Sequence, residues 1–385
     1  MSCRRRPEAG ARRGARLLAA LPAALIALAA GALPGAARAA DERFLVGGLL
    51  DAEYWQTDDA SLLLSRNGGG GAPAGRLRLW AAADFAEGLQ GFALGRTESG
   101  RGSEEGETEV ELEQAFLRYT FRAPLRLRLE AGVLPVPIGD FARRYMSNVN
   151  PLIGSPDGYS VSYPAGVQVI GMAGALDFRV AIVDLPFINE DYVPEPGSAP
   201  RPALAAGVTP ITGARFGAYA TRGPYLGPAV DGALPAGSAW EDFGQSVAGV
   251  EAQFSRGHFE AHADLALSRY EVPGLPRDAR GKAWYVEPKF TFTPRLFAAL
   301  RFERNDYPYI APVAPGVWIG STVEFTDIEA GIGWRLGPDT IFKASYRRDD
   351  WNVSGSLVDM FPDGHAFAVQ VSHSFSVNSW FDRPR

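Results

Sequence analysis

The sequence predicts an all-β fold, a transmembrane antiparallel up-and-down β-barrel of about sixteen strands with short periplasmic turns and long external loops. Apolar and charged residues alternate at period two through most of the chain, which places them on opposite faces of extended strands. Short turns alternate with longer loops, as in bacterial outer-membrane barrels. The amino terminus is basic and then apolar, which is the pattern of an export signal.

Residues 1–39 are predicted to be a cleaved signal peptide. Several arginines precede an apolar run from Leu17 to Ala36, and Ala37-Arg38-Ala39 fits the small-x-small cleavage pattern. Residues 40–385 then form a single barrel domain in the cell outer membrane. Removing the signal takes away seven arginines and one glutamate, so the net charge moves from −6 to −12. Such an acidic chain argues against a nucleic-acid partner, and Cys3, in the signal, leaves no disulfide to form.

The first half of the chain contains eight expected strands. The hairpin from Glu111 to Gly139 illustrates the alternation, because Leu117 and Leu129 fall on one face while Arg118 and Glu130 fall on the other. The glycine-rich run at 67–71 is expected to be a flexible loop. The eight strands cover residues 43–56, 76–85, 91–98, 111–121, 125–133, 166–173, 178–184 and 201–209.

The second half contains eight more strands with the same pattern. In one of them, Leu300 and Phe302 alternate with Arg301 and Glu303. The aromatic and proline-rich segment at 305–321 is expected to be an external loop. The strands cover residues 214–221, 245–254, 259–270, 282–293, 295–304, 322–336, 340–350 and 365–375.

The apolar strand faces are predicted to contact lipid rather than a protein core. They are rich in alanine and leucine, whereas a soluble β-sandwich, the alternative, interlocks two inner faces of large side chains. In lipid the sheet must close, because open edges leave backbone groups without hydrogen bonds. Aromatic residues near strand ends fit girdles at the membrane interfaces: Tyr54, Trp55, Tyr119, Trp284, Trp334 and Trp351.

The charged strand faces would then line a water-filled lumen, because about sixteen strands enclose more space than side chains can fill. These groups either neutralise one another or set up a transverse field that filters ions. Both signs of charge are present, so the pattern does not give the sign of the filter. The residues expected to line the lumen include Arg76, Arg78, Arg118, Arg126, Arg128, Glu130, Arg301 and Glu303.

The run ELEQAFLRYTF, followed by LRLEAGVLPVPIG and PAGVQVIG, resembles the family of phosphate-selective porins of the O and P type. The resemblance implies a passive outer-membrane porin, a homotrimer in which the third external loop narrows the lumen. That loop corresponds to residues 140–165 and carries Arg143 and Arg144. If it folds inward, both arginines are expected to approach Arg126 and Arg128 and form an anion-favouring constriction. The alternative is an ordinary surface loop.

Weakly selective diffusion of small polar or anionic solutes is the expected function, because the chain after the signal is acidic and has only three lysines, Lys282, Lys289 and Lys343. A second hypothesis is a specific uptake channel for an aromatic or hydrophobic molecule, marked by loop aromatics: Tyr225, Tyr307, Tyr309 and Trp318. A third is an outer-membrane hydrolase, which needs a nucleophile with a base. The available bases would be His258, His262, His365 and His373.

Outer-membrane lipid and lipopolysaccharide are the expected partners. Acidic loop residues could hold divalent cations against lipopolysaccharide phosphates, although a solvated loop is the simpler interpretation. The candidates are Glu104, Glu105, Glu107 and Glu109. The sequence has no metal-ligand spacing and no catalytic motif, so no cofactor is predicted.

Overall fold

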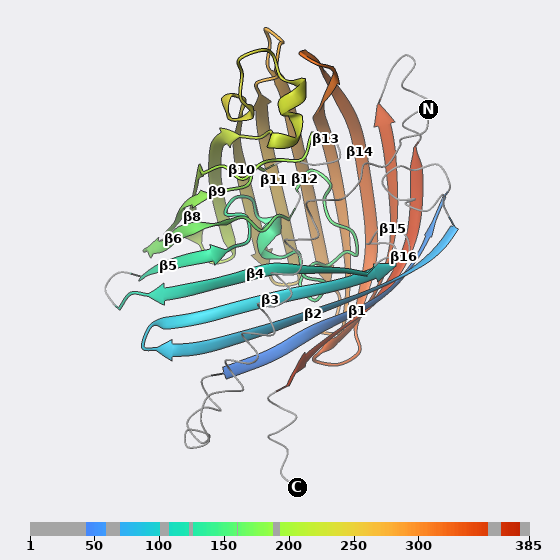
Figure 1. The fold of residues 1–385 in the computed structure, drawn as a ribbon. Helices are drawn as coiled ribbons and strands as arrows, with labels where there is room; N and C mark the ends of the chain where they lie inside the picture. The colour runs from blue at the N-terminus through green and yellow to red at the C-terminus, as the bar shows by residue number, and fades with distance from the viewer. Residues whose placement is uncertain are drawn as a thin grey trace.

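The computed structural model describes residues 44–58, 70–100, 108–122, 126–159, 161–187, 193–352 and 363–377, which form a closed β-barrel (Figure 1). The expected signal peptide at 1–39 lies outside the described residues, as do Glu104, Glu105 and Glu107. Sixteen strands follow one another in the described part of the chain. They are β1 (Phe44–Thr57), β2 (Gly70–Ala86), β3 (Leu89–Gly100), β4 (Thr108–Thr120), β5 (Arg126–Val133), β6 (Ala165–Ala173), β7 (Leu176–Val183), β8 (Arg201–Ile211), β9 (Ala214–Pro224), β10 (Gly244–Arg256), β11 (Phe259–Tyr270), β12 (Ala279–Thr291), β13 (Leu296–Ala314), β14 (Val317–Arg335), β15 (Thr340–Asn352) and β16 (Gly364–Ser376).

Each strand is antiparallel to its neighbours in the chain, and β1 also pairs with β16, which closes the sheet. The closing register runs from Gly47 opposite Ser376 to Thr57 opposite Ala366. The predicted fold class is therefore confirmed, and each of the expected strands overlaps an observed one.

The barrel buries charged side chains and exposes apolar ones. On β13, Leu300 is 44% exposed, whereas Arg301 and Glu303 are both 0% exposed. On β4, Leu117 is 52% exposed. A soluble protein does the reverse, so the outer surface has the composition of a lipid-facing barrel and the inner surface that of a polar lumen. Among the described residues, no helix is long and apolar enough to cross a bilayer.

The segment at 305–321, expected to be a loop, is instead the upper part of the β13–β14 hairpin. Each of these strands has 19 residues, and they are joined at Gly316, whose φ of 72° favours a residue without a Cβ. A register shift between Pro312 and Ala314 accommodates the second proline of the segment. Similarly, β2 begins at Gly70, inside the glycine-rich run expected to be a loop.

Two of the expected girdle tryptophans face inward. Trp55 packs beside small residues of β16, and Trp351 packs against Phe325 with ring centroids 4.9 Å apart. The period of two puts both on the luminal face, which proximity to a strand end does not reveal. Other girdle residues are exposed on the outer face as expected: Tyr54, Tyr119 and Trp334.

The connection between β9 and β10, residues 225–243, packs against the top of the β13–β14 hairpin (Figure 1). It contains η2 (Pro228–Ala233) and η3 (Trp240–Asp242). The Trp318 indole donates a hydrogen bond of 2.8 Å to the carbonyl of Ala233. Three of the four aromatics expected to mark solute binding are buried in this cluster and act in packing: Tyr225, Tyr307 and Trp318.

Candidate functional site in the barrel lumen

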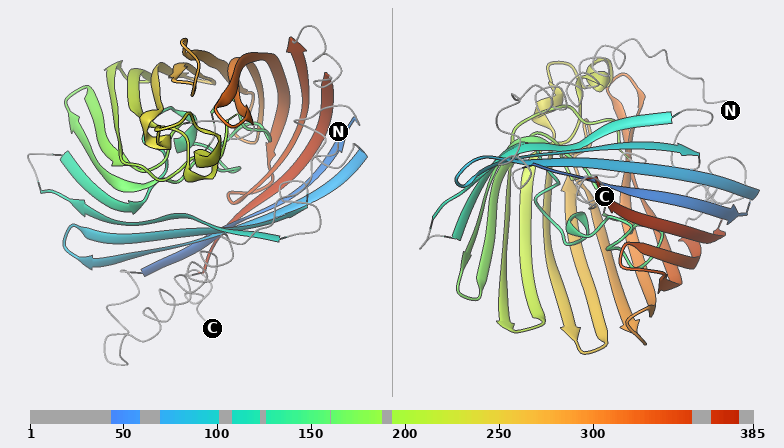
Figure 2. Two further views of the ribbon diagram at one scale, coloured as in Figure 1. Left: turned by 45° about the horizontal axis from the view of Figure 1, so that its top comes forward. Right: turned by 90° about the horizontal axis from the view of Figure 1, so that it is seen from below.

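The third external connection, residues 134–164 between β5 and β6 and here called L3, runs through the inside of the barrel (Figure 2). It leaves the wall at Pro137-Ile138-Gly139, where Gly139 has a φ of 78°. This left-handed conformation suits glycine, which permits the sharp inward turn. The short helix η1 (Phe141–Arg143) follows at once.

Apolar side chains of L3 pack against the inner wall formed by β7 to β12. The Tyr159 and Tyr285 rings meet edge to face, with centroids 5.0 Å apart, and the Tyr159 hydroxyl donates to the Ala283 carbonyl at 3.0 Å. The contact is close. A Cβ added to Gly158 would lie 2.2 Å from Asn305 Oδ1. The loop is therefore closely packed against the wall, and Val136, Ile138 and Phe141 form part of this contact.

Asp140 is the centre of the first polar anchor of L3. Its backbone N–H donates to Asp264 Oδ2 at 3.1 Å. Its carboxylate is bonded to His262 Nδ1 at 2.6 Å and to Gln253 Nε2 at 2.5 Å. Arg144 Nε donates to it at 3.0 Å, four residues farther along the loop. One carboxylate thus joins the loop to β10 and β11.

The electrostatics of this anchor keep both loop groups charged. Burial raises the pKa of Asp140, but the hydrogen bond from His262 and the charge of Arg144 outweigh it and hold that pKa well below its usual value. Burial opposes the charge of Arg144, yet Tyr285, Glu287 and Asp140 raise its pKa overall. The ion pairs of Arg144 with Asp140 and Glu287 therefore persist at neutral pH.

Lys343 and Glu329 form a second anchor on the opposite part of the wall, β14 and β15. Glu329 Oε1 accepts hydrogen bonds from two successive L3 amides, at 3.1 Å from Ile153 and 3.0 Å from Gly154. The Lys343 ammonium, which is buried, uses all three of its protons on L3 carbonyls. Those acceptors are Ser147 at 2.8 Å, Asn150 at 3.1 Å and Leu152 at 2.9 Å.

Four arginines, here called the arginine column, line the lumen beside L3: Arg143 of L3, Arg179 of β7, and Arg126 and Arg128 of β5. Arg128 and Arg179 are both register partners of Ile170 and so point to the same face. Arg179 also lies within electrostatic reach of Arg143. Arg126 and Arg128 are exposed. Within the described ranges, no ion pair joins Arg126, Arg128 or Arg179 to an acid.

The other residues expected to line the pore are held in pairs or against L3. Such pairs present little net charge to the lumen. Arg76 meets Glu98 at 2.9 Å, Arg78 meets Glu113 at 2.9 Å, Arg118 meets Glu130 at 2.6 Å, Arg301 meets Glu287 at 3.0 Å, and Glu303 accepts the Gly158 amide at 2.6 Å.

Both loop arginines are expected from the sequence to approach Arg126 and Arg128, but Arg144 does not. Arg144 turns the other way, into Asp140 and Glu287, because these acids lie next to it. Arg143 meets Glu251 at 2.7 Å but keeps 34% of its side chain exposed. The sequence reasoning overlooked Asp140, although it directly follows the corner at Gly139.

A luminal cavity of about 260 Å³ lies at the ends of β1 to β4 that carry the short turns. The Arg118 guanidinium stands 5.2 Å from the centre of the Phe116 ring at its edge. Apolar side chains make up most of the lining, and three polar ones stand among them. The apolar residues include Leu45, Ala82, Phe92 and Phe116, and the polar ones are Asp84, Gln90 and Arg118.

Neither a protein-family profile nor a curated protein sequence matches the chain. Solved structures do share its architecture. An anion-selective porin from Comamonas acidovorans is 9% identical, with a TM-score of 0.59 over 86% of this chain and 99% of that chain. The fold is that of an outer-membrane barrel. Outer-membrane expressed OmpT of Vibrio cholerae is 10% identical, with a TM-score of 0.56 over 86% and 97% of the two chains.

A trimer form of in-vitro folded OmpT from the same organism is 12% identical, with a TM-score of 0.54 over 86% of this chain and 98% of that chain. Identities this low establish the porin-like sixteen-stranded barrel as a fold and nothing finer. Membership of the phosphate-selective O and P type stays a prediction.

Proposed function

We propose that the protein is an outer-membrane porin through which small polar solutes and ions diffuse passively, with a modest preference for anions. The arginine column carries this proposal. Arg126, Arg128 and Arg179 offer positive charge to the lumen, and no acid is paired with them in the described residues. A charge acts on mobile ions within about one Debye length, about 8 Å at physiological ionic strength.

The preference is modest because acids stand close to the arginine column. Glu130 and Glu251 lie within electrostatic reach of Arg179, and Glu251 pairs with Arg143. Such mixed lining favours weak selectivity over a dedicated phosphate site. The similar Comamonas porin is described as anion-selective, which is consistent with the proposed preference for anions.

The outer membrane is the proposed location, and a homotrimer the proposed assembly. The exposed leucine faces of the barrel support contact with lipid. The two OmpT structures, one outer-membrane expressed and the other a trimer form of an outer membrane protein, agree with both proposals. Contact with lipopolysaccharide rests on the external acidic segment, of which Glu109, in β4, is described.

The hydrolase hypothesis has one specific observation to rest on. Thr340 Oγ1 lies 2.8 Å from His373 Nδ1, which places a hydroxyl next to a histidine base in the described residues. His373 is a register partner of the lipid-facing Leu50, so this pair belongs to the outer surface beside a short turn, away from the lumen. A channel therefore accounts for the luminal architecture better than a hydrolase does.

Planar bilayers test the proposal directly. Purified full-length barrel should insert as stable ohmic conductance steps, and the zero-current potential in a KCl gradient should have the sign of anion preference. The same preparation should leave phospholipid vesicles unhydrolysed. Absence of conductance together with lipid hydrolysis would replace the porin by the hydrolase, and a cation-signed potential would refute the role of the arginine column.

A further inference from the structure

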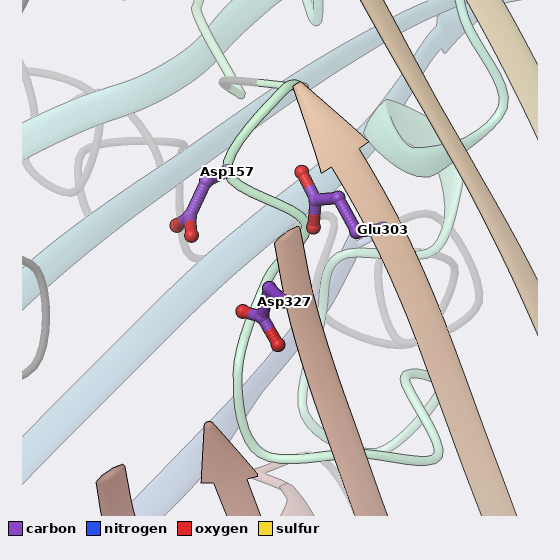
Figure 3. A group of neighbouring side chains, drawn as sticks. All are labelled: Asp157, Glu303 and Asp327. Carbon is purple, nitrogen blue, oxygen red and sulfur yellow. The ribbon is translucent and has the colours of Figure 1, made fainter. Parts of the chain in front are cut away.

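Three carboxylates meet where L3 passes β13 and β14: Asp157 of the loop, Glu303 and Asp327 (Figure 3). One oxygen from each lies within 4.8 Å of the others. Glu303 is 0% exposed and Asp327 is 1% exposed. Two strands and a loop more than a hundred residues away in sequence thus bring three like charges together, two of them buried.

Among the described residues, ion pairs reach two members of this carboxylate cluster, Asp157 and Asp327, but not Glu303. Arg347 forms ion pairs with both Asp157 and Asp327, and also with a fourth acid, Asp349, at 3.4 Å. The nearby Arg301 is already shared between Glu287 and Glu329. A fully buried carboxylate such as Glu303 is costly unless a cation or a proton neutralises it.

Several buried oxygens at the carboxylate cluster also lack a hydrogen-bond donor. Glu303 Oε2 and Asp327 Oδ1 have no partner within the described chain. Neither does the amide oxygen Oδ1 of the fully buried Asn305. That amide turns its nitrogen to Glu303 Oε1 at 2.5 Å and its oxygen toward Gly158, the residue after Asp157. Unpartnered acceptors with no donor are what a cation site presents.

We propose that Asp157, Glu303 and Asp327 bind one Ca²⁺ ion, and that this ion ties L3 to the barrel wall. Calcium binds oxygens at about 2.3–2.6 Å, so two ligands can lie up to about 4.6–5.2 Å apart. The three carboxylate oxygens lie within 4.8 Å of one another, so one calcium ion can reach all three. Magnesium demands a near-ideal octahedral shell and gives up its water reluctantly, so a buried set of protein oxygens suits calcium better.

The ion would complete the attachment of L3 around the lumen. Asp140 holds the first part of the loop and Lys343 the middle, whereas Asp157 lies on the returning part. A Kd on the order of 10⁻⁴–10⁻³ M, as in extracellular calcium modules, would keep the site filled only where calcium is abundant. The site does not depend on ion selectivity of the channel, so the two proposals can fail separately.

Calorimetric titration of CaCl₂ into chelator-washed, detergent-solubilised full-length barrel tests the proposal. One ion per chain should bind, CaCl₂ should raise the unfolding temperature, and MgCl₂ should bind more weakly. Glu303→Gln with Asp327→Asn should weaken calcium binding by about 10- to 100-fold or more. Wild-type protein that binds no calcium, or binds magnesium equally well, would overturn it.

The matched control changes two other buried acids that contact L3, Asp51→Asn with Glu113→Gln. It removes the same charge and should leave calcium binding intact. Should the strand variants fail to fold, Asp157→Asn changes the loop alone and should weaken binding in an intact barrel. Binding that survives both Asp157→Asn and the strand changes would place the ion elsewhere and refute the site.

Discussion

Replacing Lys343 with methionine should release the middle of L3 from the wall. The ammonium is buried and donates to the carbonyls of Ser147, Asn150 and Leu152 at 2.8, 3.1 and 2.9 Å. Methionine keeps most of the volume and removes every one of these bonds. Three carbonyls in a polar interior would then lose their donor, which is the expensive way to remove a hydrogen bond.

The cost can be worked from the geometry. Bonds to a charged group contribute about 1.5–3 kcal/mol each, but they are not additive and water can replace some of them. The loss of one partner from a buried charged contact, about 3–5 kcal/mol, is the appropriate scale. At about 1.4 kcal/mol per factor of ten, local opening of the loop should rise by about two to four orders of magnitude.

Hydrogen exchange read by mass spectrometry on liposome-embedded barrel measures that opening. Peptides covering 147–154 should lose protection in Lys343→Met, whereas strand peptides of β13 to β15 should keep it. Lys282→Met is the matched control, because Lys282 is exposed near the start of β12. Equal protection of residues 147–154 in wild type and Lys343→Met would refute the anchoring argument.

Three further predictions follow from the same structure. Leu300→Arg, on the lipid face, should cost about 2–4 kcal/mol of folding free energy in vesicles, whereas Leu45→Arg, which is exposed to the lumen, should cost little; equal costs would contradict the assignment of faces. Gly158→Ala should lower the unfolding temperature, because its Cβ would meet Asn305; an unchanged value in thermal scans would contradict the close packing of L3 against the wall. Asp140 has a lowered folded-state pKa, so its stabilisation is present above about pH 3.9 and is lost as pH falls further; Asp140→Asn should reduce the urea midpoint at pH 7 and not in strong acid, and equal midpoints at pH 7 would contradict this.

Local patterning was sufficient to predict the wall of the barrel. Period-two alternation sets the face of each side chain without knowledge of its partners, which is why Leu117 and Arg118 were assigned to opposite faces from sequence alone. The prediction was wrong where proline and aromatic content was given more weight than the alternation. Prolines and aromatics at 305–321 suggested a loop, yet pairing across Pro308 and Thr322 continues the hairpin.

The contents of the lumen could not be predicted in the same way. Lys343 bonds carbonyls more than 190 residues away, and those acceptors belong to the backbone, which carries no residue-type signal. The partner of Arg144 is decided by which strands L3 happens to face, since Glu287 is one acid among many on the charged faces. The inward turn at Gly139 could be predicted from the sequence, because a proline–glycine corner is typical of a sharp change in chain direction.

The zero-current potential of a charge-reversed arginine column tests the central claim most directly. Arg126→Glu, Arg128→Glu and Arg179→Glu together should turn the potential in a KCl gradient from the anion to the cation sign. Arg222→Glu, an exposed arginine outside the lumen, is the control and should leave it unchanged. A potential that is the same in wild type and triple variant would contradict the assignment of the aqueous path to the arginine column.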